Sequence, residues 1–382
     1  MSDYPARAIV DHAAIRSNVA RLREAAGPAT VMAVVKADAY GHGLLEVSRS
    51  ALAAGAGWLG VAQLSEALLV RAAGIDAPVL SWMFAPGTSL TEAVAADIDL
   101  SASAPWALRE IDAAARRTGR AARVHLKVDT GMGRGGATVD AWESLVAEAA
   151  ALEAGGSIDV VGVWSHLARA DEPEAATTAH QVEAFTAALA VVARAGLRPQ
   201  VRHLAASSGT LLAPESHFDL VRPGISVYGL TPAPDVASSA DLGLTPAMRL
   251  EADVIHVKDV PAGTPVSYGH TYTTPAAGRL AIVPLGYGDG ILRHASNAGP
   301  LLVGGHRATV AGRVCMDQFT VDLGPAGGDV EPGTPAVLFG DGRDGGPTAQ
   351  DWAEAAGTIS YEIVVRLSSR VPRIHLSPTE PR

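Results

Sequence analysis

Side chains able to do acid–base and nucleophilic chemistry stand where short apolar runs of the sequence end. Lys36 ends the run that begins at Val31, His166 ends a second run and Ser207 ends a third. An amine, an imidazole and a hydroxyl can hold or transfer protons, and an amine can also form an imine with a carbonyl group. A single lysine or histidine at such a position is usually only solvated, but several together indicate a site.

The run from Arg123 to Asp129 breaks the pattern of a buried strand. Val and Leu alternate there with His125, Lys127 and Asp129. Because a lysine buried without a partner is costly, Lys127 must be ion-paired, chemically altered or near solvent. An ion pair with Asp129 or a neighbour and a functional role explain this run equally well.

Two features favour a phosphorylated ligand. Gly224 and Ile225 follow Arg222 on the last apolar run, and backbone N–H groups in such a turn can bind a phosphate. Ser207 and Tyr40 could add hydroxyl donors, although each feature alone is equally typical of a tight turn. Lys, Arg, His and Tyr around a small apolar opening suit a phosphorylated, aldehyde-bearing cofactor. No metal site is expected, because the chain has no His-x-x-x-His or Cys-x-x-Cys spacing.

The elements that must position these groups alternate up to about Leu230. Eight apolar runs are separated by alanine-rich segments of helical periodicity, such as Gln181–Gly196, which predicts a parallel (β/α)8 barrel of the TIM type. An open doubly wound sheet is the alternative, but no Gly-x-Gly-x-x-Gly turn follows the first run. The predicted strands are Val31–Lys36, Trp58–Gln63, Pro78–Trp82, Asp99–Ser103, Arg123–Asp129, Asp159–His166, Val201–Ser207 and Leu220–Gly229.

From about Leu244 the sequence predicts a mainly β domain after a Pro- and Ser-containing linker, Thr231–Thr245. One helix is expected near Trp352, with Thr348 and Asp351 as its capping pair. The barrel domain should therefore cover residues 1–240 and the C-terminal β-rich domain residues 241–382. The predicted strands of the second domain are Ala252–Val257, Leu280–Pro284, Ala308–Val314 and Phe319–Leu323.

Composition excludes several classes of protein. The net charge of -10 argues against a nucleic-acid partner, and the single cysteine, Cys315, allows no intrachain disulfide. The N-terminal residues lack the apolar run of a secretory signal, and no apolar stretch reaches the roughly 18 residues of a membrane span. We therefore expect a cytoplasmic protein with no membrane partner.

The segment Ala33–Gly43, AVVKADAYGHG, closely resembles the cofactor signature of the alanine racemase family, whose lysine holds pyridoxal phosphate as a Schiff base. This resemblance implies fold type III, a homodimer with active sites at the subunit interface, and D-alanine supply for peptidoglycan in a bacterium. Further matching blocks follow in order along both predicted domains: His125–Gly135 (HLKVDTGMGRG), His166 with Asp171 nearby, Val221–Leu230 (VRPGISVYGL), Val266–Thr273 (VSYGHTYT), Leu285–Gly290 (LGYGDG), Gly312–Gln318 (GRVCMDQ), Ile359–Glu362 (ISYE) and Arg370–Arg373 (RVPR).

The resemblance also implies catalytic roles. Lys36 and Tyr268, the latter from the partner subunit, would be two bases on opposite faces of the substrate carbon. His166 would link Tyr268 to Arg222, which faces the pyridine nitrogen and keeps it unprotonated. Lys127 is expected to be carbamylated.

The remaining roles are binding roles. Carbamylated Lys127 would orient Arg134, which contacts the phenolic oxygen of the cofactor and the substrate carboxylate. The resemblance places Met316 of the partner subunit at the substrate carboxylate and Tyr287 and Arg293 in the access channel. It assigns the cofactor phosphate to Tyr40, Ser207, Gly224, Ile225 and Tyr361.

Two positions depart from the family pattern, and other functions compete. Asp38 stands where the family often has Asn, and Ala206 stands where an Asn commonly precedes the phosphate-binding serine. A racemase of serine, lysine or a broader range would share the fold, as would a decarboxylase of basic amino acids. The block around Tyr268 favours racemisation over decarboxylation. A non-catalytic pyridoxal-phosphate homeostasis protein would lack the second domain.

Overall fold

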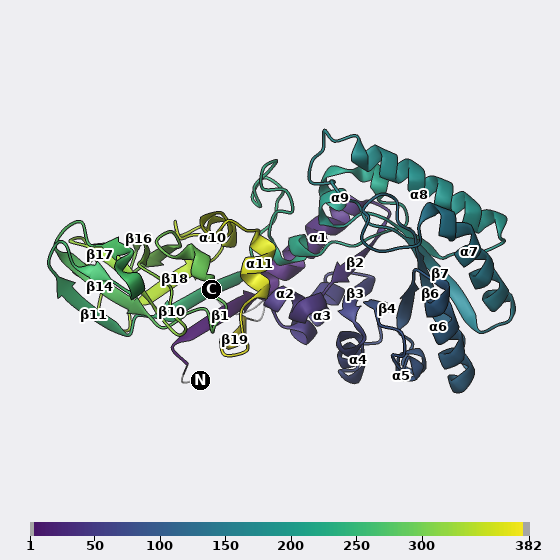
Figure 1. Ribbon diagram of the computed structural model, residues 1–382, viewed down its shortest axis with the longest axis horizontal. Coiled ribbons are helices and arrows are strands. Elements are labelled where there is room, and N and C mark those ends of the chain that lie inside the picture. The colour runs from purple at the N-terminus through teal and green to yellow at the C-terminus, as the bar shows by residue number, and fades with distance from the viewer. Residues whose placement is uncertain (1–3, 377–382) are drawn as a thin grey trace.

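The computed structural model describes residues 4–376 and shows two lobes joined side by side (Figure 1). One lobe is a parallel eight-stranded sheet with helices outside it, and the other is built mainly of strands. This arrangement confirms the predicted combination of a TIM-type barrel with a mainly β domain.

The parallel strands follow one another around the barrel in the order β8-β7-β6-β5-β4-β3-β2-β9. A parallel bridge between Ala206 and Arg222 joins the two ends of this order and closes the ring. The Val, Leu and Ala side chains of the apolar runs face the surrounding helices, whereas a separate small cluster contains Met32, Trp58 and Leu80. The strands are β2 (Thr30–Val34), β3 (Trp58–Gln63), β4 (Val79–Met83), β5 (Asp99–Ala102), β6 (Ala122–Lys127), β7 (Ile158–Trp164), β8 (Val201–His203) and β9 (Leu220–Val221).

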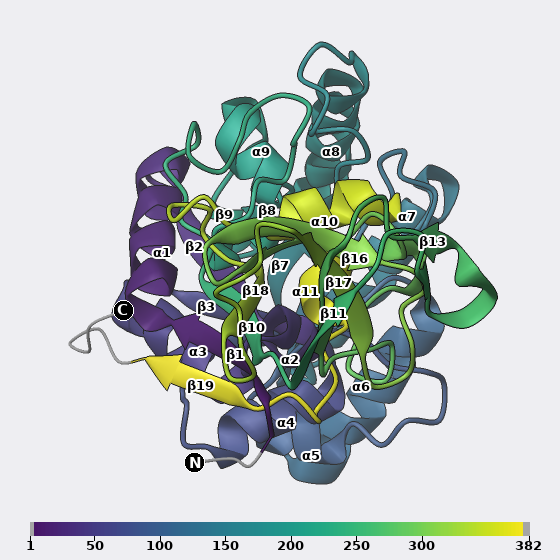
Figure 2. The same cartoon turned by 90° about the vertical axis from the view of Figure 1, so that its left-hand side faces the viewer.

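Helices surround the barrel, as the view from the second lobe shows (Figure 2). The helix expected over Gln181–Gly196 is α8, which buries Phe185 and Val192, and Gly196 follows it with a positive φ of 86°. The helices of this lobe are α1 (His12–Ala26), α2 (Lys36–Gly41), α3 (Leu44–Ala53), α4 (Leu64–Ala72), α5 (Thr91–Ala95), α6 (Pro105–Thr118), α7 (Val139–Ala154), α8 (Thr177–Arg194) and α9 (Ser207–Leu212), with short 3-10 turns η1 (Pro214–Ser216) and η2 (Ile225–Tyr228).

Several predicted barrel strands extend too far toward their carboxyl ends. The strand predicted over Leu220–Gly229 ends at Val221, because Pro223 cannot donate to a ladder and the chain then enters η2. Lys36 and Ser207 each begin a helix instead of ending a strand, and His166 lies two residues beyond β7. Lys36, His166 and Ser207 therefore follow the strands, whereas Lys127 is the last residue of β6.

A nine-stranded sheet forms the second lobe and includes the first strand of the chain. Strand β1 (Ala6–Asp11) pairs antiparallel with β10 and parallel with β19. The sheet order is β11-β14-β17-β16-β15-β18-β10-β1-β19. The other strands are β10 (Met248–Asp253), β11 (His256–Val260), β14 (Gly278–Val283), β15 (Pro300–Val303), β16 (His306–Ala311), β17 (Phe319–Gly324), β18 (Pro335–Phe339) and β19 (Arg373–Leu376), beside a small hairpin of β12 (Pro265–Val266) and β13 (Tyr272–Thr273).

One predicted strand of this lobe is wrong and one helix is confirmed. The strand expected over Ala252–Val257 crosses a break, because β10 pairs with β18 whereas β11 pairs with β14. Thr348 and Asp351 form the expected capping box at the start of α10 (Ala349–Ala356). The lobe also contains η3 (Tyr268–His270), η4 (Arg293–Ala295) and α11 (Ser360–Val365).

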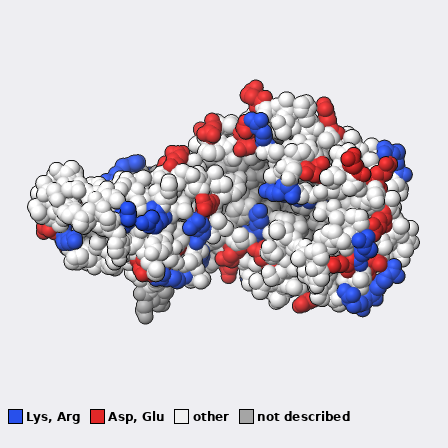
Figure 3. Space-filling model, in the orientation of Figure 1, with Lys and Arg blue, Asp and Glu red and all other residues white. Residues whose placement is uncertain are grey.

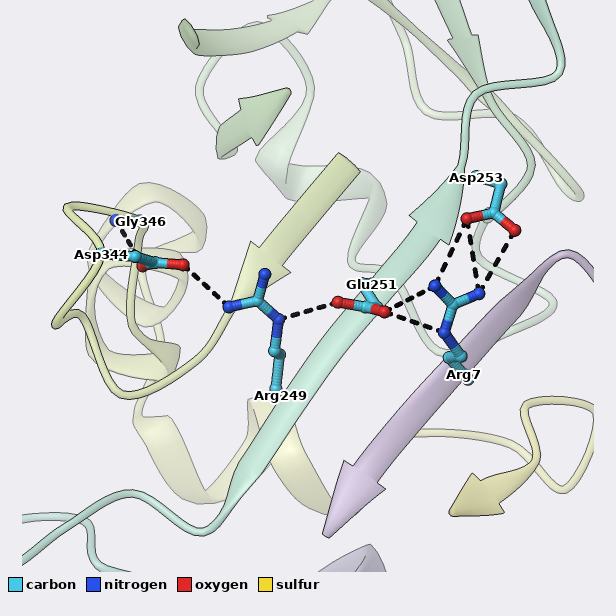
Figure 4. Close-up of polar contacts among 6 residues, drawn as sticks. All are labelled: Arg7, Arg249, Glu251, Asp253, Asp344 and Gly346. Carbon is cyan, nitrogen blue, oxygen red and sulfur yellow. Dashed lines mark hydrogen bonds and ion pairs between the residues drawn. The ribbon is translucent and has the colours of Figure 1, made fainter. Parts of the chain in front are cut away.

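A ladder of charged side chains crosses β1 and β10 (Figure 4). Glu251, only 8% exposed, lies between Arg7 at 2.6 Å and Arg249 at 2.8 Å. Arg7 also contacts Asp253 at 3.2 Å, and Arg249 contacts Asp344 at 2.8 Å. The ladder fixes the N-terminal strand to the C-terminal sheet.

Replacing Glu251 by Gln should destabilise the protein by about 1–3 kcal/mol, because two largely shielded guanidinium groups lose their shared carboxylate. Asp259→Asn is the matched control, since Asp259 is 89% exposed beside Arg279 and should contribute less than about 0.5 kcal/mol. Denaturant unfolding of both variants measures the difference. Equal effects of the two substitutions would contradict the importance of the ladder.

One face of the surface carries charges of both signs (Figure 3). Within residues 4–376, no helix is both long and apolar enough to cross a bilayer. On the face shown in Figure 3, Lys and Arg side chains are interspersed with Asp and Glu, and a hollow separates the two lobes.

Candidate active site

The segment after β2 forms one turn of left-handed helix. Ala37, Asp38, Ala39 and Tyr40 all have φ between 52° and 54°, a conformation that costs roughly 1–2 kcal/mol per residue. The turn is held from outside, since the amide of Ala37 donates to Glu66 at 2.5 Å and Asp38 accepts from the amide that begins α3 at 2.8 Å. It places Lys36 and Tyr40 at the same opening of the barrel.

Ala37→Gly tests this geometry, because glycine adopts positive φ without steric cost. We expect stability to be unchanged or raised by up to about 1 kcal/mol. The exposed Ala147 in the middle of α7 is the control, and Ala147→Gly should cost about 1 kcal/mol. Thermal unfolding compares the two variants, and an equal loss at both positions would show that the turn is not strained.

Lys36 has the surroundings of a reactive amine. Its Nζ lies 6.0 Å from the ring centre of Tyr40 and 5.7 Å from that of Trp82. Within residues 4–376, no carboxylate approaches it to ion-pair distance. Burial and the neighbouring Arg134 lower the pKa of the Lys36 amine. A larger fraction is therefore uncharged and able to act as nucleophile or base.

Lys127 does not form the ion pair with Asp129 that its sequence allowed. The Asp129 carboxylate instead accepts from the amides of Gly131, Met132 and Gly133. The Nζ of Lys127 lies 4.2 Å from the ring centre of Trp164, and burial together with Arg222 lowers its pKa to about 8. Among the described residues Lys127 forms no ion pair, and it is only partly buried, so a chemically altered lysine and a lysine near solvent are the explanations that remain.

Arg222 is buried among neutral acceptors. Its guanidinium donates to Nδ1 of His203 and Nδ1 of His166, both at 3.1 Å, and to the carbonyl of Ser165 at 2.8 Å. Burial lowers the pKa of Arg222 to about 9. Burial and Arg222 hold the pKa of His166 well below its usual range, so this imidazole is neutral. Because arginine only donates, the proton of His166 is on Nε2.

A cradle for an oxyanion lies beside the left-handed turn. The Ser207 hydroxyl accepts from the amide of Gly224 at 2.9 Å, and Ile225 begins the buried 3-10 turn η2. Only glycine fits at position 224, because a Cβ there would lie 2.4 Å from the Tyr40 hydroxyl. The ring of Tyr361, from α11, lies 6.2 Å from that of Tyr40. These groups offer hydroxyl and amide donors from both lobes.

Tyr268, Met316 and Tyr287 form a second group on the β-rich lobe. They are 71%, 55% and 42% exposed, and Arg293 is exposed in η4. The amide of Tyr287 donates to the Cys315 carbonyl at 3.0 Å, next to Met316. Among the described residues, no hydrogen bond or ring contact joins this group to Lys36. The chain thus brings together the barrel residues and Tyr361, but not these four.

Comparison with known proteins identifies the family. The model of the alanine racemase N-terminal domain matches residues 10–232, and that of the C-terminal domain matches residues 247–375. The alanine racemase of Beutenbergia cavernae is 62% identical over 373 residues, covering 98% of each chain. The chain belongs to the alanine racemase family. Mycobacterium tuberculosis has an alanine racemase that is 46% identical over 97% of this chain and 96% of its own.

Solved alanine racemases have the same fold. The structure from Streptomyces lavendulae matches with a TM-score of 0.97 and 50% identity, covering 99% of this chain and 98% of its own. The structure from Streptomyces coelicolor matches with a TM-score of 0.96 and 54% identity, covering 98% of both chains. The resemblance seen in the sequence is confirmed: the protein is an amino-acid racemase, an isomerase that depends on pyridoxal phosphate.

The barrel opening fits that cofactor. Arg222, Arg134 and Lys36 lie close enough to lower the pKa of Lys127, so the opening carries an excess of positive charge. An anionic phosphate and a phenolic oxygen would balance this charge. The amine of Lys36, the cradle at Gly224 and the arginines match the aldehyde, phosphate and ring of pyridoxal phosphate.

Proposed function

We propose that this protein interconverts L-alanine and D-alanine, with Lys36 and Tyr268 of the partner subunit as bases on opposite faces of the substrate carbon. The observation that carries the proposal is the half-buried Lys36 amine with a lowered pKa at the barrel opening. Tyr268 is 71% exposed on the other lobe, as a residue that completes a neighbour's site must be. The proposal of a homodimer with shared sites rests on this pairing of Lys36 at the barrel opening with an exposed Tyr268 on the other lobe.

Pyridoxal phosphate, when bound, supplies the electron sink that makes the substrate carbon acidic enough to lose its proton. Lys36 would hold the cofactor through its amine, and the same amine, when free, would take or return a proton on one face of the substrate carbon. Tyr268 does the same on the other face. The Nε2 proton of His166 is available to Tyr268, because Nδ1 accepts from Arg222. That donation would stabilise the phenolate form of Tyr268.

The other residues hold and orient the bound groups. Arg222, which only donates, would face the pyridine nitrogen and keep it unprotonated. Arg134 would contact the phenolic oxygen and the substrate carboxylate. The phosphate would be bound by Ser207, Tyr40, Tyr361 and the amides of Gly224 and Ile225.

The substrate side is assigned to the partner subunit. Its Met316 amide would meet the substrate carboxylate, and Met316 with Tyr361 would keep the pocket small enough to favour alanine over serine or lysine. Tyr287 and Arg293 would line the access channel. The division into residues 1–240 and 241–382, the cytoplasmic location and the supply of peptidoglycan precursor stay predictions.

Lys127 is proposed to be carbamylated, so that it becomes an anion beside Arg134. The reaction joins an uncharged amine to bicarbonate and releases water. With a pKa of about 8, roughly a tenth of the amine is uncharged at pH 7 and roughly nine tenths at pH 9. Incorporation of isotope-labelled bicarbonate, followed by NMR, should therefore rise between these pH values. The exposed Lys258 is the control, and equal labelling of Lys127→Ala protein would contradict the assignment.

L-Alanine in deuterated water tests the proposed function. Optical activity should fall to zero while deuterium enters the α position, because each turnover exchanges that proton with the bases. Retained optical activity without deuterium uptake would refute alanine racemisation. Serine and lysine in the same assay would show the substrate range.

A further inference from the structure

A chain of buried polar side chains crosses the interior of the barrel beneath Arg222. Asp99 on β5, His125 on β6 and His203 on β8 are all 0% exposed. His203 Nε2 lies 2.8 Å from His125 Nδ1, and His125 Nε2 lies 3.2 Å from the Asp99 carboxylate. With the contact of Arg222 to His203 at 3.1 Å, four side chains form one continuous path.

Arg222 fixes the direction of every bond in this chain. Because a guanidinium has no acceptor, His203 must accept at Nδ1 and so carries its proton on Nε2. His203 then donates to Nδ1 of His125, which must carry its own proton on Nε2 and donate to Asp99. Each group in this arrangement donates toward the carboxylate.

The charges of the site match this direction. Within residues 4–376, Arg222 forms no ion pair with a carboxylate. The Asp99 carboxylate at the far end of the hydrogen-bonded path therefore balances the positive charge of Arg222. Burial alone would raise the pKa of Asp99, but its bonds to His125 and Arg123 lower it, and Asp99 is ionised. Burial and Arg222 hold the pKa of His203 well below its usual range, which agrees with a neutral ring.

Residues on β7 leave room for these hydrogen-bonded side chains and hold them in place. Position 162 on β7 must be glycine, because a Cβ there would lie 2.2 Å from Nδ1 of His125. The Trp164 ring stacks on His203 at an interplanar angle of 4°, and the Arg222 guanidinium lies 4.9 Å from the centre of the same ring. His203 and Arg222 therefore have little freedom to exchange partners.

We propose that Asp99 is a positioning residue for racemisation, which acts through His125 and His203 to hold Arg222 charged and oriented toward the cofactor. This inference rests on the proposed role of Arg222 at the pyridine nitrogen. Asp99 touches neither substrate nor cofactor in this assignment. Its effect is to set which nitrogen of each histidine carries the proton.

Asp99→Asn should reverse the direction of the hydrogen bonds between Asp99 and Arg222, because Arg123 determines how the new amide group is oriented. Arg123 Nε donates to the other Asp99 oxygen at 2.5 Å, so the single amide oxygen of Asn must face Arg123 and its NH2 group must face His125. His125 would then accept at Nε2 and donate from Nδ1, and Nδ1 of His203 would carry a proton. Two donors would face each other between His203 and Arg222.

The double substitution Asp99→Asn with Arg123→Leu separates this effect from simple loss of charge. Without Arg123, the Asn amide can turn its oxygen toward His125 and restore the original direction. Arg123→Leu alone keeps Asp99 bonded to His125 and should keep the original tautomers.

The test measures tautomers and rates on the full chain loaded with pyridoxal phosphate. In isotope-labelled protein, nitrogen NMR of His125 and His203 should show protonated Nε2 in the wild type and protonated Nδ1 in Asp99→Asn. The kcat of that variant should fall by about 10- to 100-fold, with substantial recovery in the double variant. Circular dichroism checks that each variant is folded.

Unchanged tautomers in Asp99→Asn, or a double variant no more active than the single one, would overturn the proposal. Reversed tautomers with an unchanged kcat would overturn the link between Asp99 and the reaction. Failure of the proposed function looks different, since the wild type itself would then not racemise L-alanine although its histidine tautomers were as derived.

Discussion

Lys36→Ala is expected to abolish racemisation while the protein stays folded. The variant loses both the covalent attachment of the cofactor and one of the two bases, so kcat should fall by at least about 10³-fold. Lys36 is half-buried, and within residues 4–376 its Nζ has ring contacts at about 6 Å and no hydrogen bond or ion pair, so its removal should leave the barrel intact. Loss of L-alanine optical activity over time measures the rate, and circular dichroism monitors the fold.

The small number of lysines makes the attachment site easy to assign. The chain contains three, Lys36, Lys127 and Lys258. Reduction of the loaded enzyme with borohydride, followed by peptide mapping, should place the cofactor on Lys36. Lys258→Ala is the control and should racemise as the wild type does. Attachment to Lys127, or full activity of Lys36→Ala, would refute the assignment.

Mixed dimers of two inactive variants should regain activity. Tyr268→Phe removes the second base, and Lys36→Ala removes the first. If each site takes Lys36 from one subunit and Tyr268 from the other, a mixed dimer has one intact site and one doubly damaged site. After denaturation and random reassembly at equal amounts, half of the dimers are mixed, so about a quarter of wild-type activity should return.

The control reassembles each variant with itself, which should restore nothing. A mixture that stays inactive, with mixed dimers demonstrated by differently tagged chains, would mean that Lys36 and Tyr268 act within one subunit. Dilution below the dimer dissociation constant offers an independent check. The monomer should keep cofactor bound at Lys36 and lose racemisation.

The sequence predicted strands well where burial alone decides them. Trp58–Gln63, a short and largely apolar run, coincides with β3, and Phe319–Leu323, in which apolar and polar residues alternate, lies within β17. Strand ends were less predictable, because the hydrogen bonds between two strands stop where the neighbouring strand stops. The alternation through Ala252–Val257 could not show that the chain changes partners there.

The site was only partly predictable, for a similar reason. His125 was visible as a polar residue in an apolar strand, but its partners Asp99 and His203 come from other strands and look ordinary in sequence. The left-handed turn at Ala37–Tyr40 was also hidden, because it is stabilised by Glu66, which is 29 residues beyond Ala37. Both features depend on contacts between residues that are far apart in the sequence, and no local sequence pattern indicates them.

The place of β1 in the second lobe determines when this protein can finish folding. β1 precedes the whole barrel in the chain, whereas its neighbours β10 and β19 begin at Met248 and Arg373. At roughly 5–20 residues per second of synthesis, β10 is made about 10–50 s after β1. During that time β1 has no native partner, and the charge of Arg7 near its start discourages pairing with other nascent chains. The barrel can assemble during this interval, but the sheet of the second lobe is complete only after β19 has been made.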